Sequence, residues 1–123
     1  MMSTAEIRMA NSTAPSRNER RRDTRYSFTA EIEILDPQSG VKITARTSDF
    51  SRGGCYVDMF SPLPKDVAVK VRLTKWRQTL EAQAMVVYSS VGMGMGLMFG
   101  VLDPAQRALV ETWITQLREV QPC

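Results

Sequence analysis

The stretch FTAEIEILDPQSGVKITAR, residues 28–46, decides the fold class of this chain of 123 residues. In its first part apolar residues alternate with polar ones, and the apolar set is Phe28, Ala30, Ile32 and Ile34. A period of two indicates a β-strand that is buried on one face. The segment DPQSG has the composition of a turn, and the alternation returns after it at Val41, Ile43 and Ala45. The sequence therefore predicts a β-hairpin here.

Four more predicted strands follow the hairpin, and the first two of them alternate in the same way. They are Cys55–Met59, Val67–Leu73, Thr79–Tyr88 and Gly94–Gly100, and the first of them comes after an interruption at SDFSRGG, residues 48–54. Short strands separated by turns are typical of a small antiparallel barrel or sandwich. We therefore expect a mainly β fold for this part of the chain.

The pattern becomes helical after Asp103. Asp103 is a good N-cap, Pro104 suits the first helical position, and Gln106 stands where a capping box has its second member. Apolar residues then recur at helical spacing, at Leu109, Val110, Trp113, Ile114 and Leu117. One amphipathic C-terminal helix is therefore predicted to pack against the barrel, with Trp113 as its main contact with the core.

The ends of the chain differ in character. Residues 1–17 are polar, small and without periodicity, which predicts a flexible N-terminal tail. The remaining length fits one domain, which we expect to span residues 18–123. The net charge of +3 is modest and does not by itself indicate a nucleic-acid-binding protein.

Composition restricts the class of function. The chain has no histidine, which excludes Ser-His-Asp and Cys-His catalysis and the commonest metal ligand. Its two cysteines, Cys55 and Cys123, do not form a CxxC motif. We therefore expect a binding protein that is not an enzyme and uses no metal or cofactor.

The N-terminus lacks the apolar part of a signal peptide, and no apolar stretch approaches the roughly 20 residues that span a bilayer, so a cytoplasmic protein is expected.

A cluster of arginines lies in NERRRDTRYSF, residues 18–28, directly before the first predicted strand. Arg21 and Arg25 are four residues apart, which places them on one face of a helical or an extended segment. Each guanidinium offers a planar fork of donors that fits phosphate oxygens, or guanine O6 and N7, in a bidentate manner. A solvated charge run or a weak nucleic-acid-binding tail would have the same composition. The arginines alone do not decide between these interpretations.

A second candidate segment is DFSRGG, residues 49–54, between two predicted strands. Its glycines allow the backbone to approach a ligand closely. Asp49 can accept hydrogen bonds from guanine N1–H and N2–H, and Ser51 can bond a phosphate or cap the turn. An ordinary tight connection with local Asp and Ser turns fits the segment as well.

Together the two segments resemble the signature of the PilZ domain family, which is RxxxR followed by [D/N]xSxxG. The first motif matches Arg21 and Arg25, and the second matches Asp49, Ser51 and Gly54. The segment GMGLMF, residues 94–99, is similar to the last strand of that family, which precedes a terminal helix. The resemblance implies a six-stranded antiparallel split β-barrel with a C-terminal α-helix packed against it.

The resemblance also implies a receptor for the bacterial second messenger cyclic di-GMP. Arg21 and Arg25 would contact phosphate and guanine, while Asp49, Ser51 and Gly54 would line the other side of the ligand. These five residues form the predicted binding site.

Further basic and small residues beside the motifs are secondary ligand-binding candidates. In the family the residue just before RxxxR influences how many ligand molecules bind, and here that residue is Arg20, so a stacked ligand dimer is one option. The other secondary candidates are Arg22, Arg52 and Gly53.

The expected mechanism is that the arginine loop becomes ordered on ligand binding and presents a new surface to a separate effector protein. The family is linked to motility and biofilm behaviour. The alternative is a PilZ-fold interaction adaptor that binds no nucleotide.

Binding to DNA or RNA is not expected, because aromatic residues make up only 7% of the chain and no strand has the aromatics of a base-stacking platform. Membrane binding is not expected either, and both a monomer and a homodimer remain open.

Overall fold

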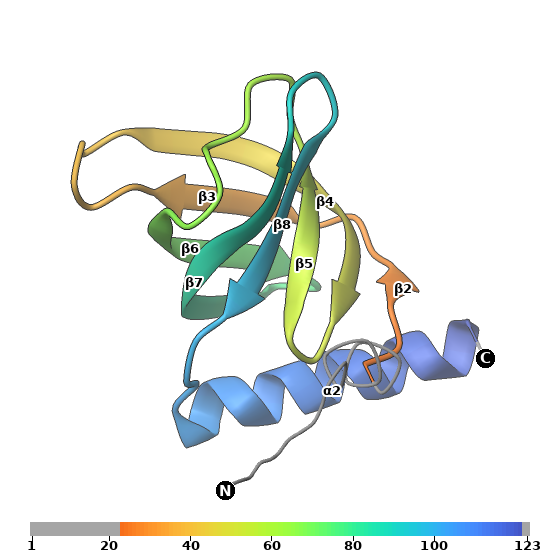
Figure 1. Cartoon of the computed structure of the whole chain (residues 1–123). Coiled ribbons are helices and arrows are strands. Elements are labelled where there is room, and N and C mark those ends of the chain that lie inside the picture. Colours follow the sequence, from red (N-terminus) through yellow and green to blue (C-terminus); the bar gives the residue numbers. More distant parts are fainter. Residues whose placement is uncertain (1–22, 122–123) are drawn as a thin grey trace, which may run out of the picture.

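The computed structural model describes residues 23–121 of the chain as a closed β-barrel with one helix (Figure 1). The strands are β2 (Tyr26–Ser27), β3 (Glu31–Leu35), β4 (Lys42–Ser51), β5 (Gly54–Asp58), β6 (Ala68–Lys75), β7 (Gln78–Ser90) and β8 (Gly94–Phe99). Six of them follow the order β4-β3-β6-β7-β8-β5, and the barrel closes because β5 also pairs with β4. The pairings are antiparallel, and β2 adds to β4 as a short further strand. The predicted mainly β, six-stranded fold is confirmed.

The helix α2 (Pro104–Val120) lies across one end of this barrel (Figure 1). Asp103 is its N-cap, as predicted, and its carboxylate accepts the backbone N–H of Gln106 at 2.8 Å. The predicted capping box is wrong, because the side-chain oxygen of Gln106 instead accepts the backbone N–H of Glu81 on β7 at 2.8 Å. Gln106 thus ties the start of α2 to the barrel. Among residues 23–121 no helix combines the length and the apolar character that crossing a membrane requires.

An aromatic cluster joins α2 to the barrel core. Trp113 is fully buried, and its ring lies 5.3 Å from Phe28, 5.6 Å from Phe50 and 6.4 Å from Trp76 between centroids. Its indole N–H donates to the side-chain oxygen of Gln78 at 3.0 Å, so the polar end of this large apolar group is satisfied. The predicted role of Trp113 as the main core contact of the helix is confirmed.

Cys55 is a buried residue of β5, facing the barrel interior. Burial raises the pKa of its thiol to about 12, with a smaller contribution in the same direction from Asp49. The thiol is therefore protonated at neutral pH and packs as a small apolar group.

The first predicted strand is divided in the structure. β2 ends at Ser27 and β3 begins at Glu31, so Phe28–Ala30 leaves the regular ladder. The buried side chain of Thr47 replaces the missing backbone pairing: its hydroxyl donates to Phe28 O at 2.6 Å and accepts the N–H of Ala30 at 2.9 Å. The hydroxyl satisfies backbone groups that would otherwise be unpaired in the core.

The predicted interruption at residues 48–54 is also corrected. β4 continues to Ser51, and only Arg52 and Gly53 form the turn into β5. The register shifts between Thr47 and Asp49, so Ser48 is the extra residue of a β-bulge. The bulge reverses the alternation of inner and outer faces, which leaves Thr47 and Phe50 inside and directs Asp49 outward.

Candidate functional site

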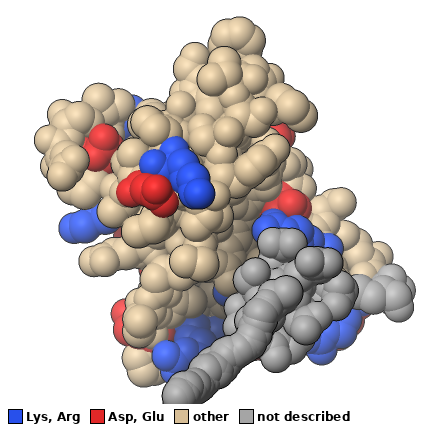
Figure 2. Space-filling view, viewed as in Figure 1, with Lys and Arg blue, Asp and Glu red and all other residues tan. Residues whose placement is uncertain are grey.

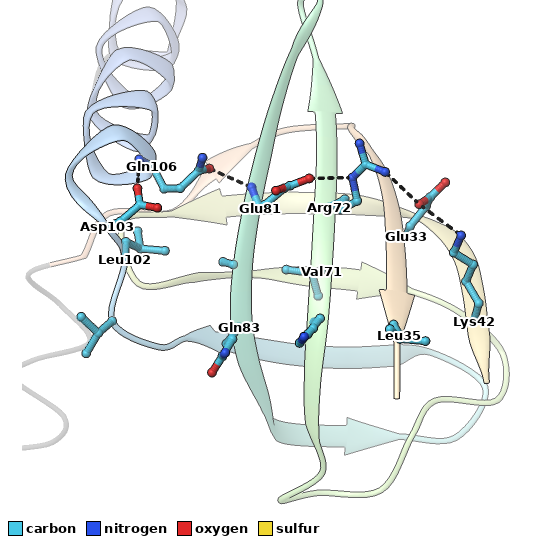
Figure 3. A pocket seen from close by; sticks show the side chains of 13 residues that line it. Glu33, Leu35, Lys42, Val71, Arg72, Glu81, Gln83, Leu102, Asp103 and Gln106 are labelled. Atoms are coloured by element: carbon cyan, nitrogen blue, oxygen red, sulfur yellow. Dashed lines mark hydrogen bonds and ion pairs between the residues drawn. The ribbon is translucent and has the colours of Figure 1, made fainter. Parts of the chain in front are cut away.

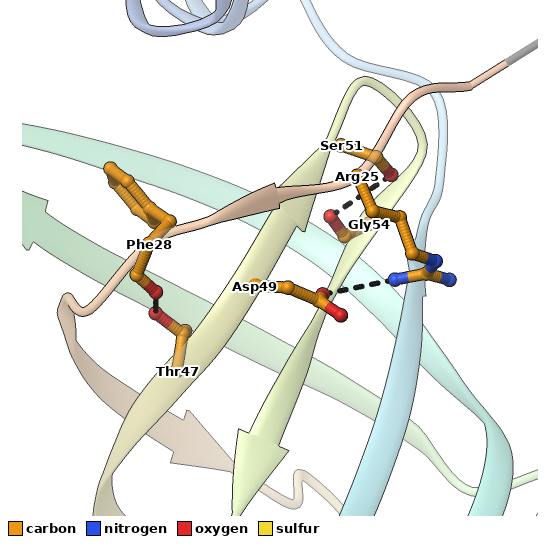
Figure 4. Close-up of polar contacts among 6 residues, drawn as sticks. All are labelled: Arg25, Phe28, Thr47, Asp49, Ser51 and Gly54. Atoms are coloured by element: carbon orange, nitrogen blue, oxygen red, sulfur yellow. Dashed lines mark hydrogen bonds and ion pairs between the residues drawn. The ribbon is translucent and has the colours of Figure 1, made fainter. Parts of the chain in front are cut away.

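Arg25 and Asp49 bring the two sequence motifs together on the outer face of the barrel (Figure 4). Arg25 directly precedes β2, and the register pairs Ser27 of β2 with Asp49 of β4. Arg25 Nη1 donates to Asp49 Oδ1 at 2.9 Å, with the side chains 55% and 29% exposed. Both groups remain accessible, so an anionic or guanine-bearing ligand can reach them from solvent.

Ser51 and Gly54 shape the turn behind this ion pair (Figure 4). Ser51 is buried, and its hydroxyl donates to Gly54 O at 3.3 Å. Gly54 stands so close to β8 that an added Cβ would lie 1.8 Å from Leu97 O. Of the five predicted site residues, these two therefore have packing roles that need no ligand.

Arg52 contacts the helix α2. Its Nε and Nη2 donate to the Glu111 carboxylate at 2.7 and 3.1 Å, which is a bidentate pair. The hydrogen bond from Arg52 lowers the pKa of Glu111, and the same bond raises the pKa of Arg52. Arg52, a secondary candidate, is thus engaged by α2 in this structure.

Asp23 lies over the turn at Gly53. A Cβ added to Gly53 would be 2.9 Å from Asp23 Oδ2. The chain segment that leads into β2 therefore crosses the second motif at Gly53 as well as at Asp49. Gly53, another secondary candidate, provides the room for this crossing.

Three predicted arginines lie outside the described residues, namely Arg20, Arg21 and Arg22. The predicted tail at residues 1–17 lies outside them as well. The RxxxR motif is thus represented here by Arg25 alone, and the role of Arg21 stays a prediction.

The end of the helix holds the outer edge of β2, a contact that the sequence did not indicate. The N–H of Ser27 donates to Gln121 Oε1 at 2.9 Å, and Gln121 Nε2 donates to Ser27 O at 2.7 Å. An amide side chain thereby pairs with an edge strand in the way a neighbouring strand would. This pairing connects the C-cap of α2 to β2, which follows the first motif, and the Arg52–Glu111 contact connects α2 to the second motif.

A pair of tyrosines, of which one lies beside Asp49, was not among the predicted site residues. Tyr56 of β5 is the cross-strand partner of Asp49, and its ring centroid lies 6.2 Å from that of Tyr88 on β7. Partial burial raises the pKa of Tyr56, and Tyr88, Asp58 and Asp49 add to this effect. The two tyrosines were missed because they lie 32 positions apart, at residues 56 and 88, and only strand pairing brings them together.

A groove of about 770 Å³ lies elsewhere on the barrel, over β3, β6 and β7 (Figure 3). Four of its charged side chains form a chain of ion pairs in the order Lys42, Glu33, Arg72 and Glu81, with separations of 3.9, 3.9 and 3.0 Å. These charges compensate one another, and Arg25, Asp49 and Ser51 do not line the groove. In the part of the chain that the structure describes, no group of His, Cys, Asp and Glu could hold a metal ion.

Comparison with known structures identifies the fold. The PilZ domain of CeSA from a cellulose-synthesizing bacterium aligns with a TM-score of 0.63 at 22% identity, covering 77% of this chain and 98% of that one. The PilZ domain of Escherichia coli YcgR, solved with c-di-GMP, aligns with a TM-score of 0.68 at 14% identity, covering 82% and 93%. Bacillus subtilis MotI/DgrA, an inhibitor of motility, aligns with a TM-score of 0.66 at 12% identity, and the match covers 82% of this chain but 52% of MotI.

The comparison of sequences gives the family. No curated protein matches the chain. The family model of the PilZ domain matches residues 19–116, which include both motifs, the whole barrel and most of α2. The chain belongs to the PilZ domain family.

Proposed function

We propose that this protein is a receptor for cyclic di-GMP that acts by binding and not by catalysis. The observation that supports the proposal best is the Arg25–Asp49 contact at 2.9 Å, which joins the two motifs on an accessible face of the barrel. A cyclic dinucleotide carries phosphates that suit guanidinium groups and guanine edges that suit a carboxylate. YcgR, a protein of the same fold, was solved with c-di-GMP.

Arg25 and Asp49 have complementary roles in the proposal. Asp49 holds the Arg25 guanidinium in place, and the remaining donors of the guanidinium stay available for a phosphate or for guanine O6 and N7. The second oxygen of Asp49 is left for guanine N1–H or N2–H. Arg21 supplies a further fork of donors in this scheme.

The other predicted residues act differently. Ser51 and Gly54 keep the β4–β5 turn in its shape and thereby fix the position of Asp49. Arg52 reaches a ligand only if it leaves Glu111, so it competes with α2 for the same guanidinium. Its contribution to affinity is therefore expected to be smaller than that of Arg25.

We further propose that ligand contact orders the arginine loop, residues 20–25, and that the ordered loop is presented to a separate effector protein. A ligand that contacts both motifs favours the arrangement in which they are close together. Hydrogen exchange of peptides that cover this loop, measured with and without cyclic di-GMP, tests the step. Unchanged exchange in the saturated protein would contradict it.

Isothermal titration calorimetry with cyclic di-GMP tests the receptor function, with GTP and cyclic di-AMP as comparison ligands. Selective, saturable binding is expected for the unmodified protein, and its stoichiometry tests the role of Arg20. Arg21→Ala, Arg25→Ala and Asp49→Ala should each weaken binding by tenfold or more, since charged hydrogen bonds contribute about 1.5–3 kcal/mol. Arg72→Ala is the matched control, because Arg72 also pairs with a carboxylate, Glu81, at 3.0 Å but on the face that carries the large groove. Equal affinity of all variants would contradict the proposed binding site, and absence of binding by the unmodified protein would contradict the receptor function.

An interaction adaptor that binds no nucleotide is the second candidate. The end of the barrel opposite α2 exposes Phe60, Val91 and Met93, which are 77%, 81% and 64% accessible. Phe60 O accepts the N–H of Gly92 at 2.7 Å, so the two loops form one apolar surface, and Figure 2 shows few charged side chains there. Such a surface suits a protein partner. Absence of any nucleotide binding in the calorimetry would favour this candidate.

A further inference from the structure

Asp49 belongs to a row of paired residues that crosses the outside of the barrel. The register places Asp49 of β4 beside Tyr56 of β5, Tyr56 beside Gly96 of β8, and Gly96 beside Tyr88 of β7. We call these four residues the outer row. Strands in a sheet lie about 4.8 Å apart, so the outer row extends for roughly 14 Å from the ion pair.

Two β-bulges direct the ends of the outer row to the outside. Thr47 and Val86 are buried, with only 1% and 0% of their surface exposed. In a regular strand the residue two positions later would face the same interior. The register shifts between Thr47 and Asp49 and again between Val86 and Tyr88. Tyr88 is consequently 54% exposed. Because bulges re-aim side chains next to functional sites, two bulges that serve one row point to a binding surface.

The two tyrosines lie close against the backbone of β8 at Gly94 and Gly96. A Cβ added to Gly94 would be 3.0 Å from Cε2 of Tyr56. A Cβ added to Gly96 would be 3.5 Å from Cβ and 3.9 Å from Cδ2 of Tyr88. The rings are 6.2 Å apart with an interplanar angle of 42°, so they form one aromatic surface over β8 that begins beside Asp49.

We propose that Tyr56 and Tyr88 form a stacking platform for a guanine base of the ligand. The inference rests on the proposed function and adds to it the subsite for the base. Every purine has a π-face that stacks on an aromatic ring, so the platform alone binds guanine and adenine alike. Asp49, at the edge of the platform, selects guanine over adenine. Guanine presents two N–H donors to the carboxylate, whereas adenine presents the acceptor N1 at the same position.

Affinities of three variants for cyclic di-GMP, measured by calorimetry, test the platform. Tyr88→Ala removes a stacking ring from an exposed position and should weaken binding by about tenfold or more. Tyr88→Phe keeps the ring and should bind within about twofold of the unmodified protein, because stacking needs the ring and not the hydroxyl. Val101→Ala is the control, since Val101 is an apolar residue, 97% exposed, that follows the end of β8 and lies outside both motifs and the outer row. It should leave the affinity unchanged.

Ring resonances give a readout that does not depend on affinity. With ¹³C-labelled tyrosine the chain has three sets of ring signals, since it contains three tyrosines. A stacked base should shift the ring signals of Tyr56 and Tyr88, whereas Tyr26, which is 5% exposed, serves as the internal reference. Binding without these shifts, and with full affinity in Tyr88→Ala, overturns the platform and leaves the receptor function standing. Failure of the unmodified protein to bind cyclic di-GMP overturns both.

Discussion

Arg25 and Asp49 are 24 residues apart in the chain and form an ion pair of 2.9 Å on the barrel surface. The pair depends on two features of the fold. The pairing of β2 with β4 brings the segments together, and the bulge at Ser48 turns Asp49 outward. The ion pair therefore reports that the two motifs are correctly assembled, although as an exposed pair it contributes little to stability.

The first prediction separates binding from folding at this pair. Arg25→Ala should change the free energy of unfolding by less than about 1 kcal/mol, because the Arg25 side chain is 55% exposed. The same change should weaken cyclic di-GMP binding by tenfold or more, since it removes a bidentate donor. Urea unfolding and calorimetry on one preparation provide both values. A large loss of stability in parallel with the affinity would show that Arg25 is structural.

The second prediction concerns the close approach of β5 and β8. Gly54→Ala should destabilise the fold by about 3 kcal/mol or more, because its Cβ would lie 1.8 Å from Leu97 O and the strands must separate. Gly100→Ala is the matched control: its Cβ would be 3.5 Å from Gln83 O, an ordinary contact, and stability should change by about 0.5 kcal/mol at most. Thermal or urea unfolding gives the comparison. Similar stability of both variants would refute the packing role of Gly54.

The third prediction concerns the hydroxyl that bridges the gap between β2 and β3. Thr47→Val keeps the shape of the side chain but leaves Phe28 O and the N–H of Ala30 without their partner in the core. A loss of about 2–4 kcal/mol is expected from two buried unsatisfied groups. Thr44→Val changes an exposed threonine of the same strand and should be neutral. A neutral Thr47→Val in urea unfolding would mean that water or a backbone shift replaces the hydroxyl.

Much of the fold could be predicted from the sequence because alternation is a local property of each strand. The hairpin at residues 28–46 and the helix that begins after Asp103 were found in this way. The prediction failed where local chemistry resembled a loop: SDFSRGG contains turn residues, yet most of it is strand. A bulge has no reliable signature in one sequence, because its extra residue is defined by the partner strand.

The candidate site was predictable to the extent that it depends on motif spacing. Spacing identified Arg25 and Asp49, which the structure brings together. It could not distinguish a ligand contact from a packing role at Gly54, because the clash with Leu97 O exists only once β8 is in place. The tyrosine pair and the contacts of α2 were missed for the same reason, since they depend on register and helix position.

The fourth prediction concerns the Arg52–Glu111 pair and its dependence on pH. The pKa of Glu111 in the folded protein is below its ordinary value of 4.5, because Arg52 stabilises the carboxylate. The pair therefore contributes stability above pH 4.5, and this contribution is lost as the pH falls through the folded pKa. Glu111→Gln should thus lower the free energy of unfolding at pH 7 by up to about 1 kcal/mol, since both side chains are substantially exposed.

The difference in the free energy of unfolding between the unmodified protein and Glu111→Gln should shrink below pH 4.5. It should vanish once the Glu111 carboxyl is protonated in both the folded and the unfolded state. Urea unfolding across the acid range measures it. Glu119→Gln is the control, because Glu119 lies on the same helix and makes no ion pair with the residues that the structure describes. A difference that stays constant with pH would show that Glu111 acts through packing. In that case the connection between α2 and the β4–β5 turn would not be ionic.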